Sequence, residues 1–427
     1  MDSPVEHEPT PSPTWRGQCL ETVLTAGVAV AFCWFFWRVL WSGGGVIGGD
    51  LYPYYMPQKF WLQQCFAQGE WPLWNPLVGF GYPILGESQT GAFYPPNLLL
   101  YRWLDLNTAY VWSQLGHYIL AFMLFTALSR RLGLSLFASW LSATVFVYGW
   151  FPPRICLEWA IIGGTWLAGS LWSATAFLQS HRPRWALMVS LCTAMSLLAG
   201  HYNLEFITLL MLAAWPLVVR QENVAVWRNG RVWGGLGVAL ACGFCMGAVQ
   251  LLPTWELKQL SQRQGDGPEF SATYGHLPPE AISQLWMPWR WYAGNEPMDR
   301  SLEQSQWLAV PDATNQAEAQ IYVGAIPFLL AVLALWWKRR EGESLTASWR
   351  WALLAMVGLL LATGWPTYVL RDVPGFSFFR GPGRYSSITV VVLAIWAGQG
   401  LDAVRRKWRI QSIKSRLVGL TVVAVSL

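Results

Sequence analysis

Residues 20–41 read LETVLTAGVAVAFCWFFWRVLW, and this stretch decides the fold class. Apart from Glu21 near its start and Arg38 near its end, it carries no charge. An α-helix rises 1.5 Å per residue, so the stretch is long enough to cross the roughly 30 Å hydrocarbon core of a bilayer. It is longer than a signal-peptide core and lacks an A-x-A cleavage pattern, so we expect it to remain as a membrane anchor.

Similar apolar segments recur along the chain. A last one begins near Leu417, too close to residue 427 to cross a bilayer, so we expect the chain to be incomplete. The pattern predicts an all-α polytopic membrane protein with about 10–11 transmembrane helices within residues 16–427. Residues 1–15 are polar and proline-rich, which predicts a disordered cytoplasmic tail. The other apolar segments occupy residues 109–128, 133–150, 158–178, 185–199, 204–219, 233–252, 321–337, 350–364 and 386–401.

The composition agrees with a membrane protein. The chain is 54% hydrophobic and 12% charged, whereas soluble domains carry about 25% charged residues. Thirty tryptophans and fifteen tyrosines suit a long membrane–water boundary. The net charge of +5 is spread over short loops, which argues against a nucleic-acid partner, because such binding needs one basic face.

The basic residues lie in alternate loops, and their distribution predicts the orientation. Cytoplasmic loops of membrane proteins are enriched in Lys and Arg, so these loops and the N-terminus should be cytoplasmic. Two long loops, residues 42–108 and 253–320, should then face outside. Within the first, residues 56–71 mix aromatic and amide side chains and predict a helix in the plane of the interface. The basic set is Arg130, Arg131, Arg182, Arg184, Arg220, Arg228, Arg231, Lys338, Arg339, Arg340, Arg405, Arg406, Lys407 and Arg409.

One carboxylate stands alone just beyond the first apolar stretch. In GGDLYPYYMPQ, residues 48–58, Asp50 is the only acid between Glu21 and Glu70. The preceding Gly48 and Gly49 allow a tight turn and a close approach by a ligand. A carboxylate here can act as a general base, bind a metal or cap a short helix, and the spacing leaves these roles open.

Further polar residues fall at the predicted outer ends of the helices. Ionisable groups at membrane depth are costly and tend to face the bundle interior. Because many polar residues share this side, the sequence predicts a polar cavity that opens outward. In FFRGPGRYSS, Arg380 and Arg384 flank a glycine–proline turn and can offer two guanidinium forks to a phosphate, or anchor to lipid headgroups. The set comprises Asp50, Asn75, Glu87, Gln89, Arg154, Glu158, His201, Asn203, Glu205, Gln250, Glu256, Arg380 and Arg384.

Several stretches resemble, in order, the landmarks of the YfhO family of bacterial multi-spanning membrane proteins. They are GEWPLWNPLVGFGYPILGESQTGAFYPPNLL, LAGHYN, AVQLLPTWELKQLSQR, YVGAIPFLLAVLAL and VPGFSFFRGPGRYSSITVVVLAIWAGQGLD. The resemblance runs from about Gly48 to Asp402. The family is similar to GT-C glycosyltransferases, which take a sugar from a polyprenyl-phosphate carrier at the outer leaflet. Many relatives are longer than this chain, often with an outer domain.

The resemblance implies a GT-C-like bundle and a glycosyltransferase of the bacterial inner membrane, acting on an envelope glycan or glycolipid. In that class an acid just after the first helix is essential, and Asp50 occupies this position. Such a transfer needs a base for the acceptor hydroxyl and cations for the departing phosphate, which makes Arg380 and Arg384 the expected phosphate clamp. Some relatives use a divalent cation and others do not, so the metal question stays open. The expected sugar and substrate contacts are Trp74, Asn75, Glu87, Gln89, His201 and Glu256.

Two other functions use the same residues. A carrier or flippase could bind a lipid-linked sugar without chemistry, and a scaffold could serve an envelope-assembly complex. A carrier should need charged residues deep within its spans, and the sequence has few. The sequence therefore favours a one-sided enzyme.

Overall fold

The computed structural model of the chain describes residues 15–45, 48–219, 229–261, 274–286, 314, 317–340, 345–370, 373, 375–376 and 378–426. Side chains are described for these residues except 338–348, 368 and 409–426. The expected tail and most of the second long loop therefore lie outside the described residues, as do Arg220 and Arg228.

Every apolar segment expected to span the membrane coincides with a helix. In the described residues no strand forms, and Asn75 and Tyr82 make an isolated bridge. The fold is therefore all-α, as the sequence predicts. The helices of these segments are α1 (Trp15–Phe36), α6 (Leu106–Arg131), α7 (Leu136–Trp150), α8 (Trp159–Ser180), α9 (Pro183–Ala199), α10 (Tyr202–Val218), α11 (Gly230–Leu260), α14 (Ala325–Arg340), α15 (Leu345–Ala362) and α17 (Ser386–Ser426).

Five helical stretches in the described part of the chain are long and apolar enough to cross a membrane. They are Trp15–Phe36, Leu106–Arg131, Trp159–Ser180, Gly230–Leu260 and Pro382–Trp408. Shorter apolar helices cover Pro183–Ala199, Tyr202–Val218, Ala325–Trp337 and Trp349–Ala362. Length and composition thus identify a membrane protein, and four more of the expected spans coincide with the shorter apolar helices.

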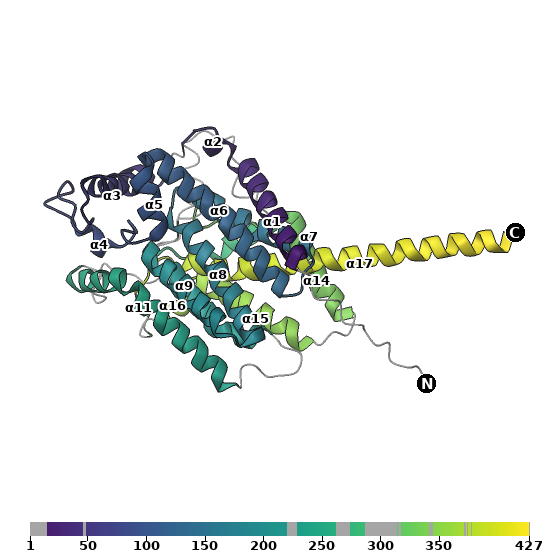
Figure 1. The fold of residues 1–427 in the computed structure, drawn as a ribbon. Helices are drawn as coiled ribbons and strands as arrows, with labels where there is room; N and C mark the ends of the chain where they lie inside the picture. The colour runs from purple at the N-terminus through teal and green to yellow at the C-terminus, as the bar shows by residue number, and fades with distance from the viewer. Residues whose placement is uncertain are drawn as a thin grey trace.

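The bundle is built around α8 and the first part of α17, whose side chains are mostly buried; Figure 1 shows both helices running through the bundle. Helix α8 packs against α6, α9 and α10, while α17 packs against α14, α7 and α15. Small residues allow these close contacts: Leu204 of α10 lies against Gly163 of α8, where a Cβ atom would collide with it. Helices α1 and α11 lie at the periphery and leave many apolar side chains exposed, as expected for faces turned to lipid.

The first long loop folds into short helices that cover one end of the bundle. They are a π-helical turn, η1 (Leu51–Tyr55), followed by α3 (Met56–Gln68), α4 (Ile84–Glu87) and α5 (Pro95–Trp103). The helix expected at residues 56–71 is confirmed as α3, which ends at Gly69 in the left-handed conformation. Its Leu62 and Phe66 pack with Tyr101 and Ala109 in a small apolar cluster. The loop is therefore docked on α5 and α6.

The C-terminal part differs from the sequence prediction. We expected a span at 386–401, a basic loop near 405–409 and a new apolar segment from Leu417. Instead α17 is one continuous helix from Ser386 to Ser426, and it projects beyond the other helices (Figure 1). The basic residues continue the helix because Arg and Lys are good helix formers and no Gly or Pro interrupts residues 401–417.

The turns assigned to the same side of the membrane contact one another. At one end, the loop end, Lys59 of α3 meets Glu158 in the α7–α8 turn at 3.0 Å. At the other, the arginine end, Arg130 meets Glu21 at 2.5 Å and Arg131 donates to Gln179 at 3.2 Å. The alternation of polar and basic loops therefore corresponds to two physical ends of one bundle.

Thiol labelling tests which end faces outside. Phe80 is fully exposed within the first long loop, and Cys19 is exposed at the arginine end. In intact cells, a membrane-impermeant maleimide should label a variant whose only cysteine is Phe80→Cys. A variant retaining only Cys19 should react after permeabilisation alone. The reverse pattern would invert the orientation.

Candidate functional site

Asp50 lies at the start of the π-helical turn that follows the first span. Its carbonyl oxygen accepts the amides of Tyr54 at 3.0 Å and Tyr55 at 3.1 Å. Its side chain is exposed and makes no capping hydrogen bond, so the helix-cap role considered from sequence is not seen. Gly49 has φ +52, and a Cβ there would lie 3.2 Å from Cβ of Cys156. Glycine therefore allows this turn to pack closely against Cys156, two residues before Glu158.

Tyr55, the last residue of that turn, is buried among charged side chains. Burial raises the pKa of Tyr55, and the nearby charges of Glu158 and Asp50 raise it further. The positive charge of Arg384 acts in the opposite direction. The phenol therefore stays protonated and can donate a hydrogen bond. Tyr55 and the side chains around it, Glu87, Gln89, Glu158, His201, Glu318 and Arg384, are called the Tyr55 cluster below.

A hydrogen-bonded chain joins Tyr55 to Glu87. The Tyr55 hydroxyl donates to Oε1 of Gln89 at 3.2 Å, and Nε2 of Gln89 donates to Oε1 of Glu87 at 3.3 Å. Tyr54 also donates its hydroxyl proton to Oε1 of Glu87. The other carboxyl oxygen of Glu87, Oε2, is buried and has no hydrogen-bond partner within the described residues. Two residues predicted to contact sugar are thus connected to the turn that carries Asp50.

Arg384 forms the cationic part of the cluster. Its Nε and Nη2 donate to the two carboxylate oxygens of Glu318, each at 2.9 Å, in a bidentate ion pair. Its guanidinium carbon lies 4.4 Å from the ring centre of Trp159, and Trp159 stacks on His201 at 4.3 Å. Burial raises the pKa of Glu318, but the charge and hydrogen bonds of Arg384 outweigh this and the net shift is downward.

His201 is held neutral beside this arginine. Burial and the charge of Arg384 hold its pKa well below the usual range. Nη1 of Arg384 lies 3.4 Å from Nε2 of His201, which accepts a hydrogen bond in the neutral tautomer protonated on Nδ1. His201 therefore orients Arg384 rather than adding a positive charge.

A buried ion pair and a buried arginine hold the cluster together. Lys59 of α3 pairs with Glu158 at 3.0 Å and also donates to the carbonyl of Thr90 at 2.7 Å. Burial raises the pKa of Glu158 although Lys59 opposes the shift. Arg154 donates to the carbonyl oxygens of Glu318 and Gln320, which fixes the backbone that presents the Glu318 carboxylate.

The turn between α9 and α10 fits closely against the first long loop. Gly200 has φ +84, and its carbonyl accepts the Ser88 hydroxyl at 2.8 Å. A Cβ at Gly200 would collide with the Ser88 carbonyl, so only glycine permits this contact. The contact places His201 next to the segment that carries Glu87 and Gln89. The predicted LAGHYN stretch is thus part of the same site.

The remaining predicted contacts have different surroundings. Asn75 is buried, pairs its backbone with Tyr82 and accepts the Leu77 amide on its side chain, so it shapes a turn. Trp74 is half exposed and packs over Gly81. Glu256 is exposed on α11. The guanidinium carbon of Arg380 lies 5.6 Å from the Tyr274 ring centre, and its backbone carbonyl accepts Nδ2 of Asn203 at 2.8 Å.

Sequence reasoning missed Tyr55, Lys59 and Glu318. Two of them left a signal: Lys59 is the only basic residue between Arg38 and Arg102, and Glu318 lies three residues before the apolar segment that begins at residue 321. Tyr55 left no such signal, because aromatic residues are abundant throughout the chain.

Two further observations bear on what the chain binds. In the part of the chain that the structure describes, no group of three or more His, Cys, Asp or Glu side chains is placed to hold a metal ion. A cavity of about 580 Å³ lies at the arginine end. Comparison of the chain with family models, with curated proteins and with solved structures found no match in any of the three.

Glu87 provides a pH-dependent test of the cluster. Burial raises its pKa from 4.5 to about 7. The folded state therefore binds more protons than the unfolded chain between these values, and its stability should fall as pH rises from about 4.5 to about 7. The expected loss is on the order of 3 kcal/mol. Thermal unfolding in detergent should show this decline for the wild type and a flatter profile for Glu87→Gln. Parallel profiles would exclude the shift.

Proposed function

We propose that the chain is a GT-C-type membrane glycosyltransferase related to the YfhO family. It transfers a sugar from a polyprenyl-phosphate donor to an envelope polymer or glycolipid on the extracytoplasmic side of the bacterial inner membrane. One observation carries the proposal: Asp50 lies in the loop after the first span, and its carbonyl oxygen accepts the amide of Tyr55, whose cluster contains Arg384. This brings a candidate base and a candidate phosphate partner to one end of the bundle.

The proposed chemistry divides between these two groups. Asp50 takes the proton of the acceptor hydroxyl while that oxygen attacks the anomeric carbon of the donor sugar. The bond between the anomeric carbon and the phosphate oxygen breaks, and its electron pair leaves with the polyprenyl phosphate. Arg384 stabilises the added negative charge. Asp50 suits the first role because its side chain is exposed and is not used as a cap.

Glu318 occupies the groups of Arg384 that a phosphate would use. A carboxylate and a phosphate present similar paired oxygens to a guanidinium. Donor binding would therefore exchange one anion for another, with His201 and Trp159 keeping the guanidinium in place. The unpartnered Oε2 of Glu87 is an acceptor suited to a sugar hydroxyl, and burial without a partner makes such a bond favourable.

The distribution of charge supports an enzyme over a carrier. Helix α8 contains no charged residue, and α6 and α17 contain none before Arg130 and Asp402. The charges of the Tyr55 cluster instead lie in turns and helix ends at the loop end. A carrier exposes its binding site to both sides in turn, and its charged residues lie near the middle of the membrane.

Replacing Asp50 tests the base. Asp50→Asn keeps the shape of the side chain and removes its basicity, so transfer from polyprenyl-phosphate sugars should fall by at least about 10²-fold. Protein level and membrane insertion should stay unchanged. Glu70→Gln, which neutralises another exposed acid of the same loop, is the matched control and should keep activity. Full activity in Asp50→Asn would reject Asp50 as the base.

Arg384 and Glu318 test the phosphate site in opposite directions. Arg384→Lys keeps the charge but loses the fork, so binding of polyprenyl phosphate should weaken about tenfold, the value of one hydrogen bond to a charged group. Arg380→Lys should cause a smaller loss. Glu318→Gln removes the competing anion, so it should bind polyprenyl phosphate several-fold more tightly while lowering the melting temperature. Unchanged binding in all three variants would make Arg384 and Glu318 a purely structural pair.

A further inference from the structure

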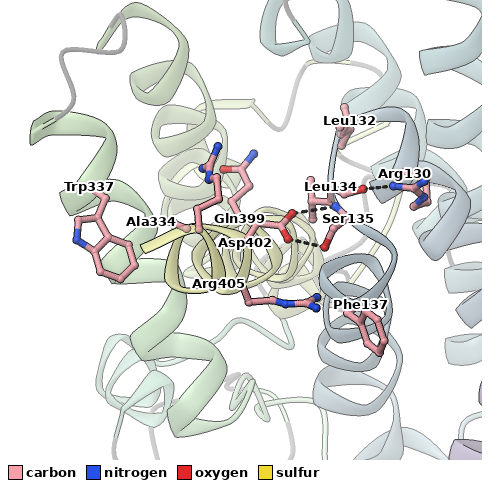
Figure 2. A pocket seen from close by; sticks show the side chains of 13 residues that line it. Arg130, Leu132, Leu134, Ser135, Phe137, Ala334, Trp337, Gln399, Asp402 and Arg405 are labelled. Carbon is pink, nitrogen blue, oxygen red and sulfur yellow. Dashed lines mark hydrogen bonds between the residues drawn. The ribbon is translucent and has the colours of Figure 1, made fainter. Parts of the chain in front are cut away.

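The cavity at the arginine end is separate from the Tyr55 cluster. It lies between the α6–α7 turn, the last turns of α14 and the middle of α17, as Figure 2 shows. Its volume of about 580 Å³ falls within the range of about 300–1,000 Å³ typical of small-molecule sites. The lining residues include Arg130, Phe137, Trp337, Asp402, Arg405 and Arg406.

The lining has a positive charge that no carboxylate of the described residues neutralises. Arg130 is committed, because it pairs with Glu21 and donates to the Leu134 carbonyl at 2.5 Å. The carboxylate of Asp402 accepts the Ser135 amide at 2.8 Å and the Ser135 hydroxyl, which turns it toward α7 (Figure 2). Within the described residues, neither Arg405 nor Arg406 pairs with a carboxylate. Two guanidinium groups thus remain for an anion.

Aromatic rings border these arginines. The guanidinium carbon of Arg405 lies 4.7 Å from the ring centre of Phe137, whose side chain is 56% exposed. Trp337 lies 4.4 Å from Nζ of the next cation, Lys407. Exposed aromatic rings beside cations are typical of the headgroup level of a bilayer, where the rings contact the upper parts of acyl chains. The cavity therefore lies at the membrane boundary rather than in open solvent.

We propose that this cavity binds the phosphate headgroup of an anionic phospholipid, with Arg405 and Arg406 as its ligands. Guanidinium groups match phosphate oxygens geometrically, and basic pockets between helices at the cytoplasmic leaflet bind anionic headgroups. The positive-inside rule assigns the arginine end to that leaflet. A soluble phosphate compound offers the same chemistry, but Phe137 and Trp337 favour a ligand that brings acyl chains. This site does not depend on the proposed glycosyl transfer.

Lipid binding to the full-length chain tests the proposal. The protein in detergent is titrated with phosphatidylglycerol, and bound lipid is counted by native mass spectrometry, with zwitterionic phosphatidylcholine as the comparison without net charge. R405Q/R406Q should lower the affinity for phosphatidylglycerol by about tenfold or more. The matched control, R182Q/R184Q, removes two arginines at the start of α9, at the same end, and should leave the affinity unchanged. Equal loss in both double variants would overturn a specific site.

A single-residue variant and a titration with inorganic phosphate complete the test. If R405Q/R406Q does not fold, R406Q alone, at an exposed position, should still weaken phosphatidylglycerol binding several-fold, and wild-type affinity would overturn the proposal. Inorganic phosphate is titrated in parallel. If it binds with the same arginine dependence and phosphatidylglycerol does not, the ligand comes from solution and the lipid assignment is wrong.

Discussion

The buried ion pair between Lys59 and Glu158 is the interaction on which the loop end depends. It joins the first long loop to the turn between α7 and α8 in a place where neither charge reaches water. Removing one partner of such a pair costs several kcal/mol, because the other charge is left buried alone. While the pair is intact, α3 stays on the bundle and Tyr55 stays among its charged neighbours. The position of Asp50 follows from that docking.

The fold was largely predictable because the bilayer limits what a chain can do. Apolar length predicts helices, and every segment expected to span coincides with one. The predicted basic loop near residues 405–409 was wrong, because the bilayer does not constrain the chain there. Beyond residue 401, polar residues with high helix propensity extend α17 as readily as apolar ones do. By length and composition, five helical stretches of the described residues qualify as full spans, and four more of the expected spans coincide with shorter apolar helices.

The candidate site was only partly predictable. Glu87, Gln89, His201 and Arg384 lie together, which their shared side of the membrane had suggested. Asn75 and Glu256 share that side but not the cluster, because sidedness does not determine which turn a residue faces. The pairing of Arg384 with Glu318 depends on two segments far apart in sequence, and no local pattern encodes it.

The continuity of α17 links the geometry of the two ends. Gly398 allows the Ala138 carbonyl of α7 to approach, and Gly400 does the same for the Leu330 carbonyl of α14. The backbones of α7 and α14 therefore pack closely against α17. Arg384 precedes its first turn and Arg405 lies roughly 30 Å further along, at 1.5 Å per residue. Each residue also turns the helix by about 100°. The helical phase of this one rod therefore sets the direction in which Arg405 points relative to Arg384, so inserting or deleting one residue between them would rotate one end against the other.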